Sequence, residues 1–426
     1  MRTVDGYGLE LTASREAAAA YNRGVDRVLR LRNGAVDSIA MAVALDPTFA
    51  LGHAALALLG HEMCAQVDIP ARLRDAQLHA RRSTVRERSH VHAIVQHLRG
   101  DSTALVAHLE RHPGDALLLS TAVPTIAFAG VTSVPEEAWE IVERAAPAYG
   151  NDWWYAGLLA FMRQEQGRFD EAMDLACTSL AEAPDAGHSA HARAHAHYET
   201  GDHAAGLAWM DGWVTGDGAA TDSLSHFSWH AALHELSTGD LDAVRRRYHD
   251  QLRPERGLGC RALVDSGSLL WRWALTPGAS DVPPMEEVAR SVDDESITRP
   301  ATPFLGMHAA VALLALDDAA GLERLATWTG GHRDRTQAEV VAPLARAMGL
   351  IVRGRCSEAA DRLAALGPQV WRVGGSDAQR EVVEETRIAA LLRAGRYDEA
   401  RDVLDRRLDR RRCRRDEAWR AAATPS

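Results

Sequence analysis

Histidines recur at helical spacing in the middle of this chain and are its residues best suited to acid–base chemistry. His188, His191, His195 and Glu199 follow one another at intervals of three or four residues, so in a helix their side chains lie within about 80° of one another, with His197 opposite. A carboxylate beside an imidazole fixes its tautomer and raises its basicity. We therefore predict His191, His195 and Glu199 as candidate catalytic residues.

Further side chains that suit a ligand lie in the neighbouring segments. The predicted ligand-binding set comprises Trp154, Phe161, His188, His226, Trp229, His230, Asp265, Ser268, Arg272 and His308. We expect Asp265, like Glu199, to orient the imidazoles of His191 and His195, and Arg272 to anchor an anionic group or a developing oxyanion. Trp154 and Trp229 would provide stacking walls.

Metal and cofactor motifs do not accompany these residues. His191 and His195 have the i, i+4 spacing that can chelate one ion, as do His226, His230 and His234. The H-E-x-x-H order of a metalloprotease helix does not occur, nor does a nucleophile elbow, a phosphate-binding loop or a dinucleotide fingerprint. We predict no bound metal and no cofactor.

A short signature that repeats along the chain predicts the elements that position these residues. It occurs as Gly167-Arg168-Phe169-Asp170, Gly201-Asp202-His203-Ala204, Gly239-Asp240-Leu241-Asp242 and Gly395-Arg396-Tyr397-Asp398. Each copy follows about fourteen helix-compatible residues, and the first two are 34 residues apart, which is the tetratricopeptide period. When each glycine is taken as the bend of a helical hairpin, the candidate residues fall on the first helices, facing one concave groove. The phase of His308 stays open, because no bend glycine follows it clearly.

The fold class that this pattern predicts is all-α: a tetratricopeptide-type superhelix of helical hairpins, or α-solenoid. Apolar residues recur with helical periodicity almost throughout, without the sustained alternation of strands. We predict a single solenoid over 1–426, with degenerate hairpins in 1–150, His-rich central repeats in 151–275, an irregular loop in 276–303 and further repeats in 304–426.

Seven segments together resemble the tetratricopeptide repeat protein 38 family. They occur in the family's order, as Asp5-Gly6-Tyr7-Gly8-Leu9, Arg86-Glu87-Arg88-Ser89-His90, His112-Pro113-Gly114-Asp115-Ala116, Ser189-Ala190-His191-Ala192-Arg193-Ala194-His195, His226-Phe227-Ser228-Trp229-His230, Ser268-Leu269-Leu270-Trp271-Arg272 and Gly374-Gly375-Ser376-Asp377-Ala378-Gln379-Arg380. The resemblance implies an all-helical superhelix and names no reaction.

The composition limits the partners and the compartment. All 48 basic residues are Arg, which suggests a bacterial GC-rich genome, and the net charge of −11 argues against nucleic acid. Seven arginines between Arg406 and Arg415 form a basic run that we interpret as a solvated helix face. The five cysteines have no zinc spacing, and no apolar run is long enough for a signal or a membrane span. We predict a cytoplasmic protein that binds no membrane.

These features favour a module that binds a small polar or aromatic molecule in the groove. A cofactor-independent enzyme that uses histidine for hydrolysis, cyclisation or proton transfer is one alternative, and a peptide or protein scaffold is another. Tetratricopeptide modules that bind peptide carboxylates use Lys and Asn clamps, and this chain has no Lys. Whether the protein forms a homodimer stays open.

Overall fold

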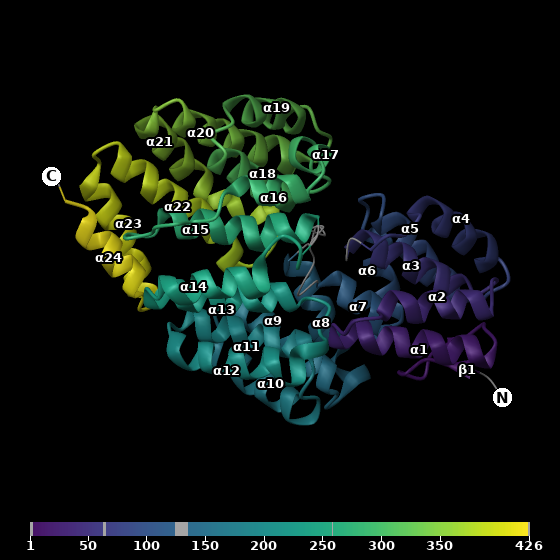
Figure 1. Cartoon of the computed structure of the whole chain (residues 1–426). Coiled ribbons are helices and arrows are strands. Elements are labelled where there is room, and N and C mark those ends of the chain that lie inside the picture. Colours follow the sequence, from purple (N-terminus) through teal and green to yellow (C-terminus); the bar gives the residue numbers. More distant parts are fainter. Residues whose placement is uncertain (1–2, 63–64, 124–134, 258, 425–426) are drawn as a thin grey trace. The chain divides into compact units, whose positions relative to one another are not determined.

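The computed structural model describes residues 3–62, 65–123, 135–257 and 259–424, and this part of the chain is helical almost throughout (Figure 1). Its only strands are β1 (Thr3–Val4) and β2 (Glu10–Leu11), which pair antiparallel with Thr3 opposite Leu11. The predicted all-α class is confirmed. No helix within the described ranges is long and apolar enough to cross a membrane.

The chain divides into two compact units. Unit 1 comprises the described residues up to Arg193 together with Asp217–Ser223, and unit 2 comprises Ala194–Gly216 and the described residues from Leu224 onward. Unit 1 contains α1 (Arg15–Arg30), α2 (Ala35–Leu45), α3 (Ala50–Glu62), α4 (Ile69–Ala80), α5 (Val85–His97), α6 (Thr103–Arg111), α7 (Ala116–Ala122), α8 (Pro135–Tyr149), α9 (Trp153–Glu165), α10 (Phe169–Glu182), the first part of α11 (Gly187–Glu199) and the 3-10 helix η1 (Asp217–Ala220).

Unit 2 begins within α11 and continues through a longer series of helices. These are α12 (His203–Thr215), α13 (Leu224–Thr238), α14 (Leu241–Arg247), η2 (Tyr248–Leu252), η3 (Ala262–Gly267), α15 (Ser268–Leu275), α16 (Met285–Ser291), α17 (Asp294–Thr298), α18 (Pro303–Ala315), α19 (Ala319–Gly330), η4 (Gln337–Val341), α20 (Ala342–Val352), α21 (Cys356–Leu366), η5 (Gly367–Val373), α22 (Asp377–Arg393), α23 (Tyr397–Arg410) and α24 (Arg414–Ala422). The segment 276–303, predicted as an irregular loop, therefore contains the two short helices α16 and α17.

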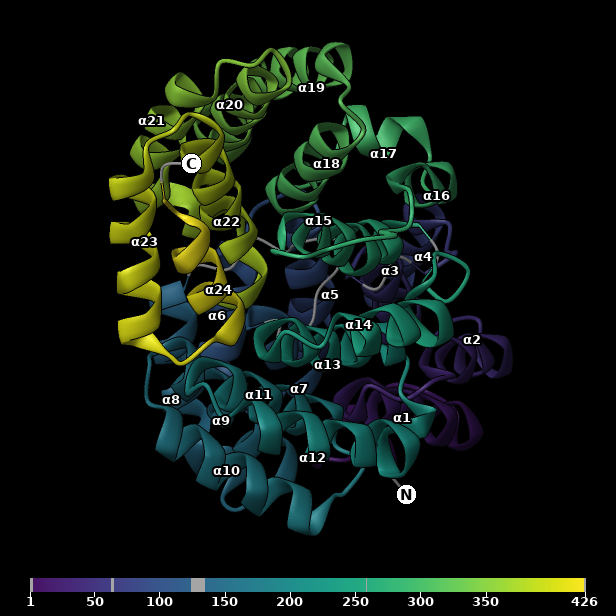
Figure 2. The ribbon, with the colours of Figure 1, turned by 60° about the vertical axis from the view of Figure 1, so that its left-hand side comes forward.

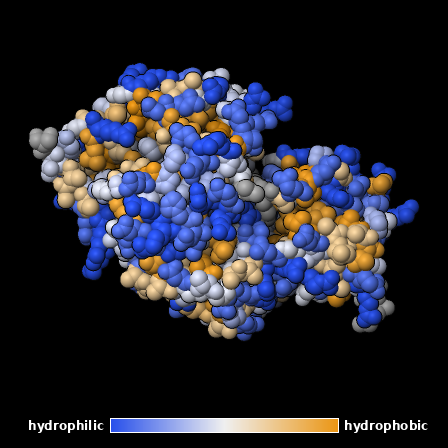
Figure 3. All heavy atoms as spheres, in the orientation of Figure 1, coloured by the Kyte–Doolittle hydropathy of each residue, from blue (hydrophilic) through white to orange (hydrophobic). Residues whose placement is uncertain are grey.

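Consecutive helices pack against each other as hairpins in both units (Figure 2). The pairs α1–α2 and α9–α10 show this in unit 1, and α12–α13 and α19–α20 show it in unit 2. Apolar side chains such as Ala54, Leu58, Ala160 and Met162 fill the core of unit 1. Hydrophilic residues cover much of the face seen in Figure 3, with smaller hydrophobic areas between them.

The four predicted bend glycines all end a helix in the same way. Gly167, Gly201, Gly239 and Gly395 have φ of 73°, 74°, 79° and 71°. After each glycine, the next N–H donates to the carbonyl five residues before it, as Arg168 does to Arg163 and Asp202 to His197. This hydrogen bond defines the Schellman motif, which needs a left-handed residue and therefore favours glycine.

One further bend uses aspartate instead of glycine. Asp317 has φ of 57°, and the following N–H of Asp318 donates to the carbonyl of Leu313 over 3.0 Å. This turn has the same hydrogen bond as the turns at the four bend glycines, but its left-handed residue is an aspartate. This explains why the phase of His308, on the helix before the turn, could not be fixed from the sequence.

Alanine substitutions at two of the bend glycines should differ measurably in how much they destabilise unit 2. A Cβ at Gly201 would lie 2.9 Å from the backbone nitrogen of Arg412, whereas a Cβ at Gly239 would meet nothing within 4 Å. Gly239→Ala pays only for the left-handed conformation, about 1–2 kcal/mol, and Gly201→Ala adds a clash with backbone that costs about 1–3 kcal/mol more. Urea unfolding, followed by tryptophan fluorescence, measures the free energy of unfolding of both variants. Equal losses would contradict the close packing of Gly201 against Arg412.

Candidate functional site

A buried hydrogen bond between His226 and Asp265 forms the centre of the candidate site in unit 2. His226 lies on α13, and Asp265 lies in the π-helical turn η3 that runs directly into α15. Nδ1 of His226 is 2.8 Å from Oδ1 of Asp265, and the two residues are only 2% and 1% exposed. Ser225 donates to the other carboxylate oxygen over 3.4 Å. Asp265 thus holds the imidazole of His226 in a fixed orientation.

Aromatic rings surround this histidine. The ring of Trp229 stacks on His226 with centroids 5.4 Å apart, and His230 meets His226 edge-on at 4.8 Å. His195, on α11, meets His230 at 4.5 Å. Burial, together with the charges of His226 and Arg380, lowers the pKa of His195 to about 3, so this ring is neutral at physiological pH. Three of the predicted imidazoles and one predicted tryptophan therefore lie together.

His308 approaches the same group from α18. It is 1% exposed, its ring lies 4.7 Å from that of Phe304, and the charges of Arg272 and His226 act on it. Burial is the main cause that lowers the pKa of His308 to about 3. Among the described residues neither ring nitrogen of His308 has a hydrogen-bond partner, and the same holds for Nε1 of Trp229. A buried polar atom without a partner costs about 1–3 kcal/mol.

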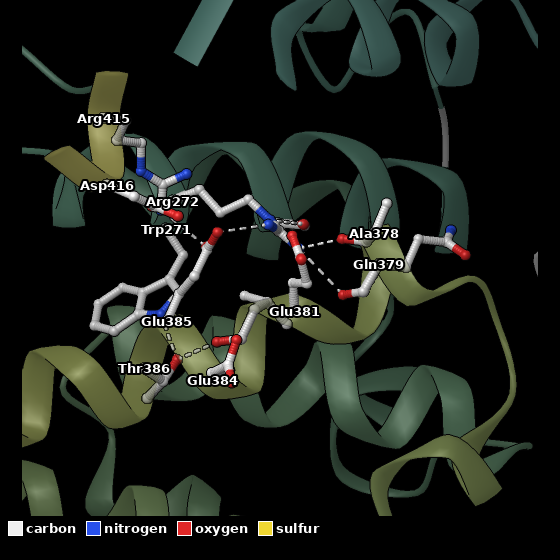
Figure 4. Close-up of polar contacts among 12 residues, drawn as sticks. Trp271, Arg272, Ala378, Gln379, Glu381, Glu384, Glu385, Thr386, Arg415 and Asp416 are labelled. Carbon is white, nitrogen blue, oxygen red and sulfur yellow. Dashed lines mark hydrogen bonds and ion pairs between the residues drawn. The ribbon is translucent and has the colours of Figure 1, made fainter. Parts of the chain in front are cut away.

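Arg272 is engaged inside unit 2 rather than presented to a ligand (Figure 4). Its guanidinium contacts Glu385 at 3.0 Å, the carbonyls of Ala378 and Gln379 at 2.7 and 3.2 Å, and the hydroxyl of Ser268 at 3.2 Å. Arg272 and Glu385 are both fully buried. The expected role of Arg272 as an anion anchor is corrected accordingly, because four of its five N–H groups are used within the fold.

Glu199 also has a partner other than the one expected. Its Oε2 lies 2.8 Å from Arg411, whose guanidinium in turn contacts Glu381 and covers the ring of Tyr198 at 4.1 Å. Burial raises the pKa of Glu199 and Arg411 opposes the shift. Glu199 thus joins a buried ion network, and the carboxylate that orients an imidazole in unit 2 is Asp265.

Part of the C-terminal basic run belongs to the same network. Arg407, Arg411 and Arg415 are at most 5% exposed, and they pair with carboxylates of α11, α22 and α24. The interpretation of the run as a solvated helix face is wrong for these three residues. They are buried because α22 supplies acidic partners, Glu381 and Glu385, on the face that they meet.

The remaining predicted residues lie in unit 1. Trp154 is buried in an aromatic group, 5.5 Å from Tyr149, and Phe161 stacks on His191 with centroids 5.4 Å apart. His188 lies 3.4 Å from the carbonyl of Val28, and burial lowers its pKa to about 4. The predicted set is therefore distributed over the two units.

Unit 1 also contains a buried polar centre that is not among the residues predicted from the sequence. Oδ2 of Asp115 lies 2.7 Å from Nδ1 of His90, 3.1 Å from Nε2 of His108 and 3.3 Å from Arg86. Burial would raise the pKa of the Asp115 carboxyl, but His90 and His108 hold it well below the usual value. The two histidines and Asp115 have donor atoms within 4.8 Å of one another, as a metal site requires, but the neighbouring guanidinium repels a cation. The only signal in the sequence was that Arg86, His90 and Asp115 lie in segments quoted for the family resemblance, and His108 had no such signal.

No protein-family model matches the chain.

Proposed function

We propose that the protein binds a small polar or aromatic molecule beside the His226–Asp265 pair of unit 2, on helical hairpins of the tetratricopeptide type. The observation that carries the proposal is the set of buried polar atoms without partners, the two ring nitrogens of His308 and Nε1 of Trp229. A ligand with a few donors and acceptors would satisfy them and would stack on the aromatic rings. The four identical glycine bends support the hairpin type.

An enzyme that transfers protons is the second candidate, and the 2.8 Å contact between Asp265 and His226 is the observation that favours it. A histidine oriented by a buried carboxylate is the arrangement that general acid–base catalysis uses. In this case the molecule bound beside His226 and Asp265 is converted and released as product, whereas a binding module releases it unchanged.

Ligand retention tests the proposal. Native mass spectrometry of the protein as purified, followed by a ligand-observed NMR screen with a library of polar and aromatic metabolites, should identify a bound molecule. The double variant His226→Gln/His308→Gln should weaken its binding at least about tenfold, since each lost hydrogen bond is worth about 1 kcal/mol. His249→Gln, an exposed histidine of the same unit, is the matched control. If the double variant bound the ligand with the same affinity as the wild-type protein, the proposed site would be contradicted. The native mass spectra also show whether the protein forms a dimer.

Asp265→Asn separates the two candidate functions. If the ligand is a substrate, this change should lower kcat by about 10²–10⁴-fold with little change in KM, because the carboxylate acts through His226. If the molecule is only bound, no conversion is seen with either protein.

A further inference from the structure

Unit 1 contains a cavity of 210 Å³, apart from the residues of the site in unit 2, whose lining includes four acidic and three aromatic side chains. Its walls come from the turn between β1 and β2 and from the beginnings of α5, α7 and α9, with one face of α1. At about 30 Å³ per molecule, the volume corresponds to about seven waters. The cavity is therefore large enough for a small organic molecule.

The charges that line the cavity are unbalanced. Four carboxylates, those of Asp5, Asp26, Asp115 and Asp152, face one cationic side chain, Arg86. Arg86 is already engaged by Asp115 at 3.3 Å and by the carbonyl of Glu10 at 2.5 Å. Arg30 neutralises part of Asp26 at 3.0 Å. The remaining negative charge favours a cation and opposes an anion.

The carboxylates are held in place by the backbone and by neighbouring side chains. Asp5 accepts hydrogen bonds from the N–H groups of Tyr7 and Leu9 at 2.9 and 2.8 Å. Asp152 caps α9 by accepting from the N–H of Tyr155 at 2.9 Å. These groups need no rearrangement before a ligand binds, which limits the entropy lost on binding.

Tyr7 contacts two of these carboxylates, since its N–H donates to Asp5 and its hydroxyl lies near Asp152. Its hydroxyl donates to Asp152 over 3.5 Å. Burial raises the pKa of Tyr7, and Asp152, Asp26 and Asp5 raise it further. A positive charge beside this hydroxyl would be stabilised by all three carboxylates.

Two buried oxygens near the cavity have no hydrogen-bond partner among the described residues. Oδ1 of Asn22, a lining residue, is one, while the amide nitrogen of Asn22 donates to the carbonyl of Val4 at 3.0 Å. The hydroxyl of Tyr149 is the other; its ring meets that of Tyr7 at 5.2 Å, and the residue is 8% exposed. Besides burial, Tyr7, Asp115 and Asp152 raise the pKa of Tyr149, so its hydroxyl is within range of the cavity's charges. Of these two oxygens, Oδ1 of Asn22 belongs to the lining and can accept a hydrogen bond from a ligand's ammonium group.

Three sequence segments that the predicted function did not use meet at this cavity. They are Asp5-Gly6-Tyr7, the start of Arg86-Glu87-Arg88-Ser89-His90, and Asp115-Ala116. Behind Asp115, His90 and His108 hold the carboxylate, as described above. The segments are 81 (86 − 5) and 29 (115 − 86) residues apart in the sequence, and the fold brings them together.

We propose that this cavity binds a small organic cation, an amine whose ammonium group lies among Asp26, Asp152 and Asn22 and whose apolar part packs against Tyr7, Tyr21 and Leu29. The ammonium donates hydrogen bonds to oxygens that are already in position, and the aromatic rings add cation–π attraction. A divalent metal ion is less suited, since it prefers six or more oxygen ligands and has no use for apolar walls.

Isothermal titration calorimetry at neutral pH with matched probes tests the proposal. The probes are benzylamine, putrescine and choline as cations, benzyl alcohol and benzoate as neutral and anionic counterparts of benzylamine, and calcium chloride. At least one amine should bind at least about tenfold more tightly than benzyl alcohol, because a hydrogen bond to a charged group is worth about 1.5–3 kcal/mol. Benzoate should not bind.

The double variant Asp26→Asn/Asp152→Asn should weaken binding of that amine about tenfold or more while α9 keeps its cap, since Asn caps a helix as well as Asp does. Asp68→Asn is the matched control, because Asp68 caps α4 in the same unit and does not line the cavity. The proposal would be overturned if no amine bound more tightly than benzyl alcohol, if calcium or benzoate bound more tightly than the amines, or if the double variant bound like Asp68→Asn.

Discussion

Replacement of Glu385 by Gln should destabilise unit 2 by about 3–5 kcal/mol, the cost of removing one partner from a buried ion pair. The Glu385 side chain is fully buried and lies 3.0 Å from both Arg272 and Arg415, and 3.5 Å from Arg407. Glutamine fills the same volume but carries no charge, so three buried guanidiniums would lose a counterion. Because domains are stable by only about 5–15 kcal/mol, the urea midpoint should fall markedly.

The neighbouring residue provides the control for this prediction. Glu384 pairs with Arg407 at 2.9 Å, but its side chain is 40% exposed. Glu384→Gln should therefore cost no more than about 1 kcal/mol, as is usual for solvated ion pairs. A similar midpoint shift for the two variants would show that burial does not decide the strength of this network. Loss of the contact between Trp271 and Thr386, next to Glu385, should appear in near-UV circular dichroism of Glu385→Gln alone.

Mild acid should unfold the protein at a pH where carboxylates are still ionised. Burial is the main cause that lowers the pKa of five histidines, to about 3 for His195 and His308 and to about 4 for His97, His188 and His203. The unfolded chain binds protons near pH 6.5, so the stability from each neutral histidine is complete above that pH and is lost as the pH falls toward 3–4. At about pH 5 each histidine costs about 2 kcal/mol. Burial raises the pKa of Glu62 to about 8 and that of Glu199 to about 7, so protonation of these two carboxyls offsets part of the summed cost.

Helicity measured by circular dichroism along a pH titration tests this expectation. The wild-type protein should lose its helices between about pH 6 and pH 5. His308→Gln removes one buried imidazole near Arg272 and His226, so at about pH 5 it should recover about 2 kcal/mol relative to its own stability at neutral pH. His249→Gln, at an exposed position, should follow the wild-type curve. An acid midpoint near pH 4 or below would instead assign acid unfolding to carboxylates such as Asp115.

The two candidate sites differ in how a ligand would be recognised. In unit 2, an oriented imidazole, a second buried histidine and a tryptophan offer hydrogen bonds and ring faces without excess charge. In unit 1, the fixed carboxylates of the cavity select for a positively charged ligand. The two proposals are tested separately, since they share no probe and no variant.

The sequence by itself determined the helices, most of their bends and part of the candidate site. Helical periodicity and the left-handed glycines are local properties, so the bends at Gly167, Gly201, Gly239 and Gly395 could be predicted, whereas Asp317 makes the same turn without the signal. The same local phase predicted that His226 and Asp265 lie on neighbouring first helices and face one groove; the structure shows the two side chains in contact, whereas Asp265 was expected to orient His191 and His195.

Only the tertiary structure decided which charges are buried and what they contact. Arg272 meets Glu385 across 113 residues of sequence, and Arg411 meets Glu199 across 212. The spacing of residues along the chain contains no information about these distant carboxylate partners. Either arginine could equally well lie on a solvated helix face, and it is buried only because an acidic helix packs against it. The Asp115 centre and the acidic cavity follow the same rule: segments that are far apart in the chain become one site only when the helices between them have packed.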